Sequence, residues 1–238
     1  MSAIQRSESA WQKWQAEWEE TFCKFVEIEM QEADPGHDLA HVRRVVNAAV
    51  RIGVAEGAAA KVVLPAAWLH DCVVVAKDSP LRSQASRMAA DRAANFLMEI
   101  GYEGEFILAI QHAILAHSFS AKVAPETLEA KVVQDADRLE AIGALGLARC
   151  LMTGGSMGTQ LVSAEEPFPL NRAADDAVSS IDHLFVKLLR LPRMMQTATG
   201  SSMGEKRVAF LKYFLRELAD ELYVDQQVLE RAIEKTSK

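Results

Sequence analysis

The chain has 238 residues, half of them hydrophobic and a quarter charged, with a formal net charge of −7. This composition is typical of a globular protein with a sizeable core, and the acidic balance without a basic block argues against duplex nucleic acid as the main partner. No run reaches the length of a membrane span, the N-terminal residues lack a signal-peptide pattern, and three widely separated cysteines predict reduced thiols, so we expect a cytoplasmic protein without membrane partners.

The first predicted helix covers residues 9–31, with Ser9 as a candidate cap. Its apolar residues recur every three or four positions and form one stripe. Such a stripe could be a groove for a partner, a platform for a nucleobase or a subunit interface, which leaves a homodimer open. Packing against the core is the commoner role. The stripe consists of Trp11, Trp14, Trp18, Phe22, Phe25 and Ile28.

The second predicted helix begins after the Asp-Pro-Gly break at residues 34–36 and ends near Gly57. His37 and His41 lie near its start, four positions apart, and would share a helix face if both are helical. His41 is flanked by core positions such as Val42, whereas His37 adjoins the break. His41 is therefore the better candidate for a ligand.

The third predicted helix, residues 62–76, is almost entirely apolar and yet contains His70 and Asp71 side by side. Burying a histidine and a carboxylate is costly unless both are compensated. A bound divalent ion would compensate them, and so would a hydrogen bond between the two side chains inside the core. The dipeptide alone does not choose between these interpretations.

A polar turn at residues 77–80 leads into the next predicted helix. Lys77 and Arg82, together with the hydroxyls of Ser83 and Ser86, lie close to the start of that helix. Backbone amides at a helix start, combined with two cations, are suited to binding phosphate. A solvated capping turn is the alternative interpretation.

A further helix over residues 103–120 contains His112 and His117. Five helical residues rotate by roughly 500°, so the two imidazoles point about 140° apart and could not easily join one mononuclear site. His117 falls along one side with Ile110 and Ile114, which predicts that it points inward. His112 is expected either at the surface or behind the direct ligands, supporting one of them.

A long helix is expected over residues 127–149, and it carries Asp135 and Asp137. These carboxylates face different ways, and because both faces of the helix are largely apolar, periodicity does not choose between them. Its glycines and alanines suggest close packing on both sides. Residues 152–175 form one long irregular region, which could be a connector or a lid.

Two further helices, at about 174–191 and 204–236, complete the chain. We find no convincing strand, no internal repeat and no linker. The sequence therefore predicts an all-α helical bundle that forms a single domain over residues 1–238. Its core would be residues 37–149, with the C-terminal helices 174–236 packed on that core.

Candidate metal ligands occur on three separate predicted helices: His41, then His70 with Asp71, then an aspartate of the 127–149 helix. Inward-facing ligands on different helices are a common way to hold a divalent ion in a bundle. Two imidazoles and two carboxylates suit Mn²⁺, Fe²⁺, Co²⁺, Ni²⁺ or Zn²⁺ better than Ca²⁺, and Mg²⁺ is also acceptable. Such a site leaves positions for water and a substrate oxygen, as hydrolysis requires.

Five blocks of the sequence resemble the HD-domain metal-dependent phosphohydrolases, an all-helical superfamily with the signature H…HD…D, and most closely its YedJ/YpgQ-like branch. The resemblance implies that His41, His70, Asp71 and Asp137 bind one divalent ion, with Mn²⁺ favoured, and that Asp135 could orient a ligand imidazole. The blocks are HDLAHVRRV (37–45), LHD (69–71), KDSPLR (77–82), HSFS (117–120) and QDADRLEAIGALGLAR (134–149).

The resemblance also implies that a nucleoside or deoxynucleoside triphosphate is split into monophosphate and pyrophosphate. The ion would activate a water molecule for attack on phosphorus, and nearby cations would neutralise the developing charge. One departure is that Lys77 and Asp78 occupy the region where some HD hydrolases carry an acidic pair, so their mechanism is not carried over directly. Candidate catalytic residues are Asp71, His117 and Lys77, and candidate substrate contacts are Lys77, Arg82, His117 and Arg138.

Three alternatives stay open at this stage. The same ion could serve a nucleoside monophosphatase or a cyclic phosphodiesterase. A second ion could be held by His117 or His112. A non-catalytic HD module could sense a nucleotide, although the presence of all four ligand types argues against it.

Overall fold

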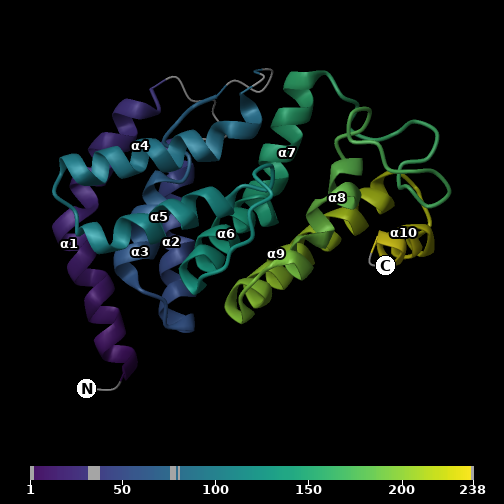
Figure 1. Ribbon diagram of the computed structural model, residues 1–238. Helices are drawn as coiled ribbons and strands as arrows, with labels where there is room; N and C mark the ends of the chain where they lie inside the picture. The colour runs from purple at the N-terminus through teal and green to yellow at the C-terminus, as the bar shows by residue number, and fades with distance from the viewer. Residues whose placement is uncertain (1–2, 32–37, 76–78, 80, 237–238) are drawn as a thin grey trace. The chain divides into compact units, whose positions relative to one another are not determined.

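The computed structural model describes residues 3–31, 38–75, 79 and 81–236, and these residues form helices joined by turns and loops (Figure 1). One isolated bridge pairs Gln160 with Ser179, and the described residues contain no strand. The all-α fold class predicted from the sequence is confirmed. None of the described helices is both long enough and apolar enough to cross a membrane.

The chain divides into two compact units, which we describe separately. The first contains Met1–Asp137 and Gln196–Gly200, and the second contains Arg138–Met195 and Ser201–Lys238. The division falls inside two helices, α6 (Leu128–Glu140) and α9 (Ala198–Glu221). The single domain over residues 1–238 stays a prediction.

The first unit contains the N-terminal helices and most of α6. Its first helix begins before position 9, the start that the sequence predicted. The helices are α1 (Ala3–Glu29), α2 (Leu39–Glu56), α3 (Ala60–Leu69), the short 3-10 helix η1 (Arg82–Gln84), α4 (Ala85–Glu99) and α5 (Gly104–His117).

The aromatic stripe predicted on α1 packs inside the first unit. Phe22 is fully buried, and the centroid of its ring lies 5.1 Å from that of Trp14 and 5.4 Å from that of Phe96 in α4. The packing role of the stripe is confirmed for Trp14, Phe22 and Phe25, which are all buried. Ile28 is the exception, because 67% of it is exposed.

Local sequence features fix both ends of α2. Asp38 precedes the helix, and its side chain accepts a hydrogen bond of 2.8 Å from the backbone N–H of His41. Gly57 ends the helix with a φ of 76°, a left-handed conformation that glycine adopts without strain. The predicted end near Gly57 is confirmed, and the first turn, which contains the buried His41, is held in place.

The helix predicted over residues 62–76 is shorter than expected. It ends at Leu69, and His70 and Asp71 lie in the turn that follows, where the backbone N–H of Cys72 donates to the carbonyl of Leu69. Residues 73–75 are all valine, and β-branched side chains disfavour a helix continuing. The turn therefore presents the His-Asp pair at the end of a buried helix.

The long helix predicted over residues 127–149 is broken in the structure. The first part, α6, ends at Glu140, and α7 (Gly143–Met157) begins at Gly143, which has a left-handed φ of 82°. Because α7 continues to Met157, the start of the irregular region predicted over 152–175 is helical. The close packing expected for the glycines of the predicted helix is found at Gly143, where an added Cβ would lie 3.2 Å from Cγ of Arg207.

The second unit contains α7 and the C-terminal helices. The helix predicted over 174–191 is replaced by α8 (Asp182–Val186) and a 3-10 helix, η2 (Leu188–Met194). The helix predicted over 204–236 is divided into α9 and α10 (Gln226–Thr236).

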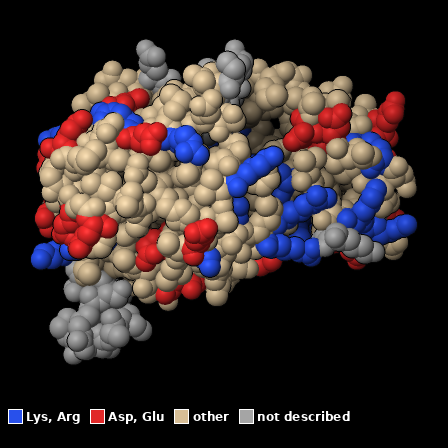
Figure 2. Space-filling view, in the orientation of Figure 1, with Lys and Arg blue, Asp and Glu red and all other residues tan. Residues whose placement is uncertain are grey.

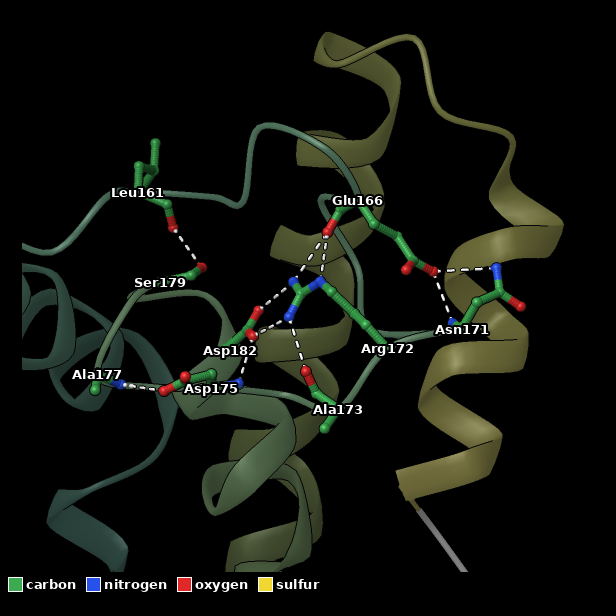
Figure 3. Close-up of polar contacts among 9 residues, drawn as sticks. All are labelled: Leu161, Glu166, Asn171, Arg172, Ala173, Asp175, Ala177, Ser179 and Asp182. Carbon is green, nitrogen blue, oxygen red and sulfur yellow. Dashed lines mark hydrogen bonds and ion pairs between the residues drawn. The ribbon is translucent and has the colours of Figure 1, made fainter.

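An arginine anchors the segment between α7 and α8 (Figure 3). The guanidinium of Arg172 donates to both carboxylate oxygens of Asp182 and to the backbone carbonyl of Glu166. Asp182 is fully buried and also accepts a hydrogen bond from the backbone N–H of Asp175. Removing either partner of such a pair would leave an uncompensated buried charge or N–H group, so the pair holds the segment in one conformation. A role for this segment as a lid stays a prediction.

The start of α9 belongs to the first unit, where two carboxylates hold it. Asp135 of α6 accepts hydrogen bonds from the backbone N–H and the hydroxyl of Thr197, at 2.8 and 2.7 Å. Glu56 of α2 accepts from the backbone N–H of Thr199, and hydrogen bonding from Thr199 lowers the pKa of this carboxyl. Carboxylates stabilise a helix start, where N–H groups lack partners within the helix. We call residues 196–200 the clasp, because they join α2 to α6.

Replacing Gly200 by alanine is expected to strain the clasp. The added Cβ would lie 2.4 Å from Oδ2 of Asp135 and 2.8 Å from Oγ1 of Thr197, so the hydrogen bonds between these residues must shift. We expect the free energy of unfolding to fall by about 1–3 kcal/mol, in spite of the higher helix propensity of alanine. Denaturant unfolding followed by circular dichroism measures this change.

Gly155→Ala is the matched control, because the added Cβ would meet no described atom within 4 Å. This variant should be as stable as the wild type or slightly more stable. A Gly200→Ala protein with wild-type stability would show that the clasp is not tightly packed.

Candidate metal centre

Four side chains from separate segments of the first unit converge on one place. His41 lies in the first turn of α2, His70 and Asp71 follow α3, and Asp137 lies in the last turn of α6. Nε2 of His41 lies 3.6 Å from Oδ1 of Asp137. Nε2 of His70 lies 3.7 Å from Oδ2 of Asp71 and 3.9 Å from Oδ1 of Asp137. The structure thus brings together all four residues that the sequence suggested as ligands.

The spacing of these atoms is suited to a single ion. One nitrogen or oxygen atom from each of His41, His70 and Asp71 lies within 4.8 Å of the others. Two ligand atoms about 2.1 Å from one ion lie at most about 4.2 Å apart, and the measured separations of 3.6, 3.7 and 3.9 Å are within that limit. Asp137 approaches both imidazoles and would complete a set of two nitrogens and two oxygens.

The hydrogen bonding of His70 supports a cation at this place. Its Nδ1 lies 2.8 Å from the carbonyl oxygen of Ala67, and since a carbonyl only accepts, Nδ1 carries the hydrogen. In the neutral imidazole, which the lowered pKa of His70 favours, Nε2 presents a lone pair. It is buried, has no hydrogen-bond partner among the described residues, and faces Asp71 and Asp137. A lone pair that faces two carboxylates is repelled unless a cation lies between them, so these donors fit a divalent ion.

The electrostatics of His70 agree with a neutral ligand. Burial lowers the pKa of this imidazole, while the charge of Asp71 acts in the opposite direction. The net effect is a pKa below its usual value, which favours the neutral form that binds metals.

The two carboxylates form the open side of the centre. The imidazoles of His41 and His70 are 2% and 0% exposed, whereas the side chains of Asp71 and Asp137 are 32% and 30% exposed. Water and a substrate would therefore approach past the carboxylates, with the imidazoles behind the ion.

His117 lies beside this group at the end of α5. Its Nδ1 bonds to the carbonyl of Ile114, and its Nε2 lies 3.5 Å from Oδ1 of Asp71. Burial acts to lower the pKa of His117, but the hydrogen bond and charge of Asp71, the charge of Asp137 and the carbonyl of Ile114 together outweigh it, so the pKa is raised. The inward direction predicted for His117 is confirmed, since the residue is only 6% exposed.

His112 lies outside the group, as its helical position predicted. Its Nε2 accepts a hydrogen bond of 3.1 Å from the backbone N–H of Glu126. His112 is therefore engaged in holding the chain that follows α5.

The candidate phosphate contacts are described only in part. Lys77 and His37 lie outside the described residues, and so does the side chain of Arg82, which begins η1. Arg138, in the second unit, donates a hydrogen bond to the carbonyl of Met194. Roles for Lys77, Arg82 and Arg138 in binding a substrate stay predictions.

The surface is less uniformly acidic than the net charge suggests. Figure 2 shows basic side chains gathered over the second unit, among acidic ones. Arg190 and Arg193 are exposed three residues apart in η2, and a 3-10 helix has three residues per turn, so they lie on one side. Lys187, just before this helix, is also exposed. A net charge of −7 therefore does not exclude an anionic ligand.

Sequence reasoning missed two contacts close to the centre. The clasp joins the first unit from more than 50 residues beyond Asp137, and no local pattern could reveal that. Gln134 donates a hydrogen bond of 2.6 Å to the carbonyl of Ala116, next to His117. Its position three residues before Asp137, on the same helix face, was the signal that could have found it.

Comparisons with known proteins match the part of the chain that contains all four candidate ligands. Residues 38–142 match the HD domain family. YpgQ of Bacillus subtilis is 35% identical over 202 residues, which cover 83% of this chain and 90% of YpgQ. The crystal structure of YpgQ in complex with ADP matches with a TM-score of 0.65 at 33% identity, covering 85% of this chain and 93% of that one. The crystal structure of an HD-superfamily hydrolase from Bacillus thuringiensis matches with a TM-score of 0.67 at 29% identity, covering 87% and 97%.

Protein loaded with Mn²⁺ and then desalted is expected to retain about one ion per chain, because the four donors surround one position. His70→Ala and Asp71→Ala should each retain almost none. Elemental analysis measures the ratio, and Mn²⁺ should raise the melting temperature of the wild type but not that of the variants.

His112→Ala is the matched control and should bind the ion as the wild type does. Full retention of Mn²⁺ by His70→Ala would refute the site, and a ratio near two in the wild type would favour a second ion.

Proposed function

The chain belongs to the HD domain family, and from this premise we propose that it is a metal-dependent phosphohydrolase that acts on a nucleotide. The observation that carries the proposal is the buried Nε2 of His70, whose lone pair faces the carboxylates of Asp71 and Asp137. A divalent ion that satisfies these donors retains positions for water and for a phosphoryl oxygen.

The reaction that we propose is the hydrolysis of a nucleoside or deoxynucleoside triphosphate to a monophosphate and pyrophosphate. The support for a nucleotide comes from YpgQ, whose structure was solved in complex with ADP. A relative with 33% identity over most of both chains makes a similar ligand the first one to test here.

His41, His70, Asp71 and Asp137 would hold the ion in this reaction, with Mn²⁺ as the favoured metal. When bound, the ion supplies Lewis-acid polarisation of a phosphoryl oxygen and lowers the pKa of a water molecule. The exposed carboxylate side of the centre would receive the phosphate chain, and the buried imidazoles would fix the position of the ion from behind.

His117 would donate a proton in the reaction, and Asp71 would hold the charged imidazole in place. In the proposed reaction, Nε2 of His117 carries a proton beside Oδ1 of Asp71, 3.5 Å away, at the partly exposed edge of the centre. From there it would donate to a phosphoryl oxygen or to the departing group. Lys77, Arg82 and Arg138 would neutralise the charge that develops on the phosphates.

The test is a nucleotide panel. Mn²⁺-loaded protein should release pyrophosphate from one or more nucleoside or deoxynucleoside triphosphates, with phosphate and pyrophosphate measured separately. His70→Ala should reduce the rate to background, and His112→Ala should retain it.

The other functions give different products. Phosphate released from monophosphates, or a linear product formed from a cyclic phosphodiester, would overturn the pyrophosphohydrolase assignment. Nucleotide binding without turnover at any metal would favour a sensing module.

A further inference from the structure

Gln134 connects α6, which carries Asp137, to the end of α5, which carries His117. It lies on α6 three residues before Asp137, so the two side chains share a helix face. Its Nε2 donates a hydrogen bond of 2.6 Å to the carbonyl of Ala116, the residue before His117. The side chain is only 3% exposed, so this hydrogen bond forms away from solvent.

The carbonyl that Gln134 binds is one that the helix leaves without a partner. The last four carbonyl groups of a helix cannot accept from an N–H within the helix. At the end of α5, the ring of His117 satisfies the carbonyl of Ile114, and Gln134 satisfies that of Ala116. Ser118 then leaves the helix with extended φ and ψ angles of −75° and 128°. Two side chains therefore fix the turn that carries His117.

The other end of the Gln134 amide indicates that stability is not its main role. Oε1 is buried and accepts no hydrogen bond from any residue that the structure describes. A buried acceptor without a partner is costly, and an apolar side chain of the same size would avoid that cost. The amide therefore gains the hydrogen bond to Ala116 but leaves its own oxygen without a partner, which lowers stability.

We propose that Gln134 is a positioning residue, which sets the place of His117 relative to Asp137 by holding the carbonyl of Ala116. The backbone at Ala116 leads directly to His117, whose Nε2 lies 3.5 Å from Asp71. A shift of this turn would move the ring away from the carboxylate and the reacting phosphate. The inference rests on the proposed function, because the reaction is what an accurate position of His117 would serve.

Gln134→Met is the principal test. Methionine has a similar length, cannot donate to Ala116 and removes the unsatisfied oxygen, so the melting temperature should change little. With His117 misplaced, kcat should fall by about tenfold or more while KM stays within about threefold. Gln134→Leu, whose side chain has no donor, should show the same loss of kcat.

Val133→Ala is the matched control, since Val133 is the neighbouring residue of α6 and is fully buried. It should lower the melting temperature and leave kcat unchanged. A loss of kcat in Val133→Ala as large as in Gln134→Met would assign the effect to general destabilisation and overturn the proposal.

A measurement without substrate separates this proposal from the proposed function. The ¹⁵N NMR signals of the His117 imidazole, identified with a His117→Gln variant, should shift or broaden in Gln134→Met. Those of His183, which bonds to Asp176 in the second unit, should not change. Unchanged His117 signals and unchanged kcat would refute the role of Gln134. If the wild type hydrolyses no nucleotide, the proposed function fails, and the imidazole signals alone decide the role of Gln134.

Discussion

A buried imidazole nitrogen and two carboxylates share one small space in the first unit, and they repel one another unless a cation lies between them. The hydrogen bond from Nδ1 of His70 to Ala67 creates this repulsion, because it directs the lone pair of Nε2 toward Asp71 and Asp137. Such an arrangement is unfavourable for folding by itself. It becomes favourable when a divalent ion binds, which links the stability of the first unit to its proposed chemistry.

The fold meets this constraint by placing the polar groups at helix ends. His41 lies in the first turn of α2, the His-Asp pair follows α3, and His117 is the last residue of α5. Helix ends carry backbone groups without helical partners, and here side chains satisfy several of them. Asp38 and the clasp (residues 196–200) therefore hold helices that carry ligands, and Gln134 holds the turn beside His117. None of these contacts occupies a ligand atom.

The sequence predicted the helical class and the convergence of the ligands better than it predicted the helix boundaries. Burying a histidine and an aspartate in an apolar run is costly, so the sequence alone draws attention to this pair. The choice of Asp137 over Asp135, in contrast, required resemblance to a family. The break before Gly143 depends on a left-handed backbone angle that periodicity does not encode. The end of α3 at Leu69 precedes three valines that the apolar pattern placed inside the helix. The contact of Asp135 with Thr197 spans 62 positions, so local pattern could not reveal it.

The most direct test of a shared ion is anomalous X-ray diffraction from crystals of the Mn²⁺-loaded protein. We expect one strong anomalous peak about 2.0–2.3 Å from Nε2 of His41, Nε2 of His70 and carboxylate oxygens of Asp71 and Asp137. A peak bound by other residues, or one that leaves His41 or Asp137 outside coordination distance, would contradict the four-ligand centre from which the proposed hydrolysis follows.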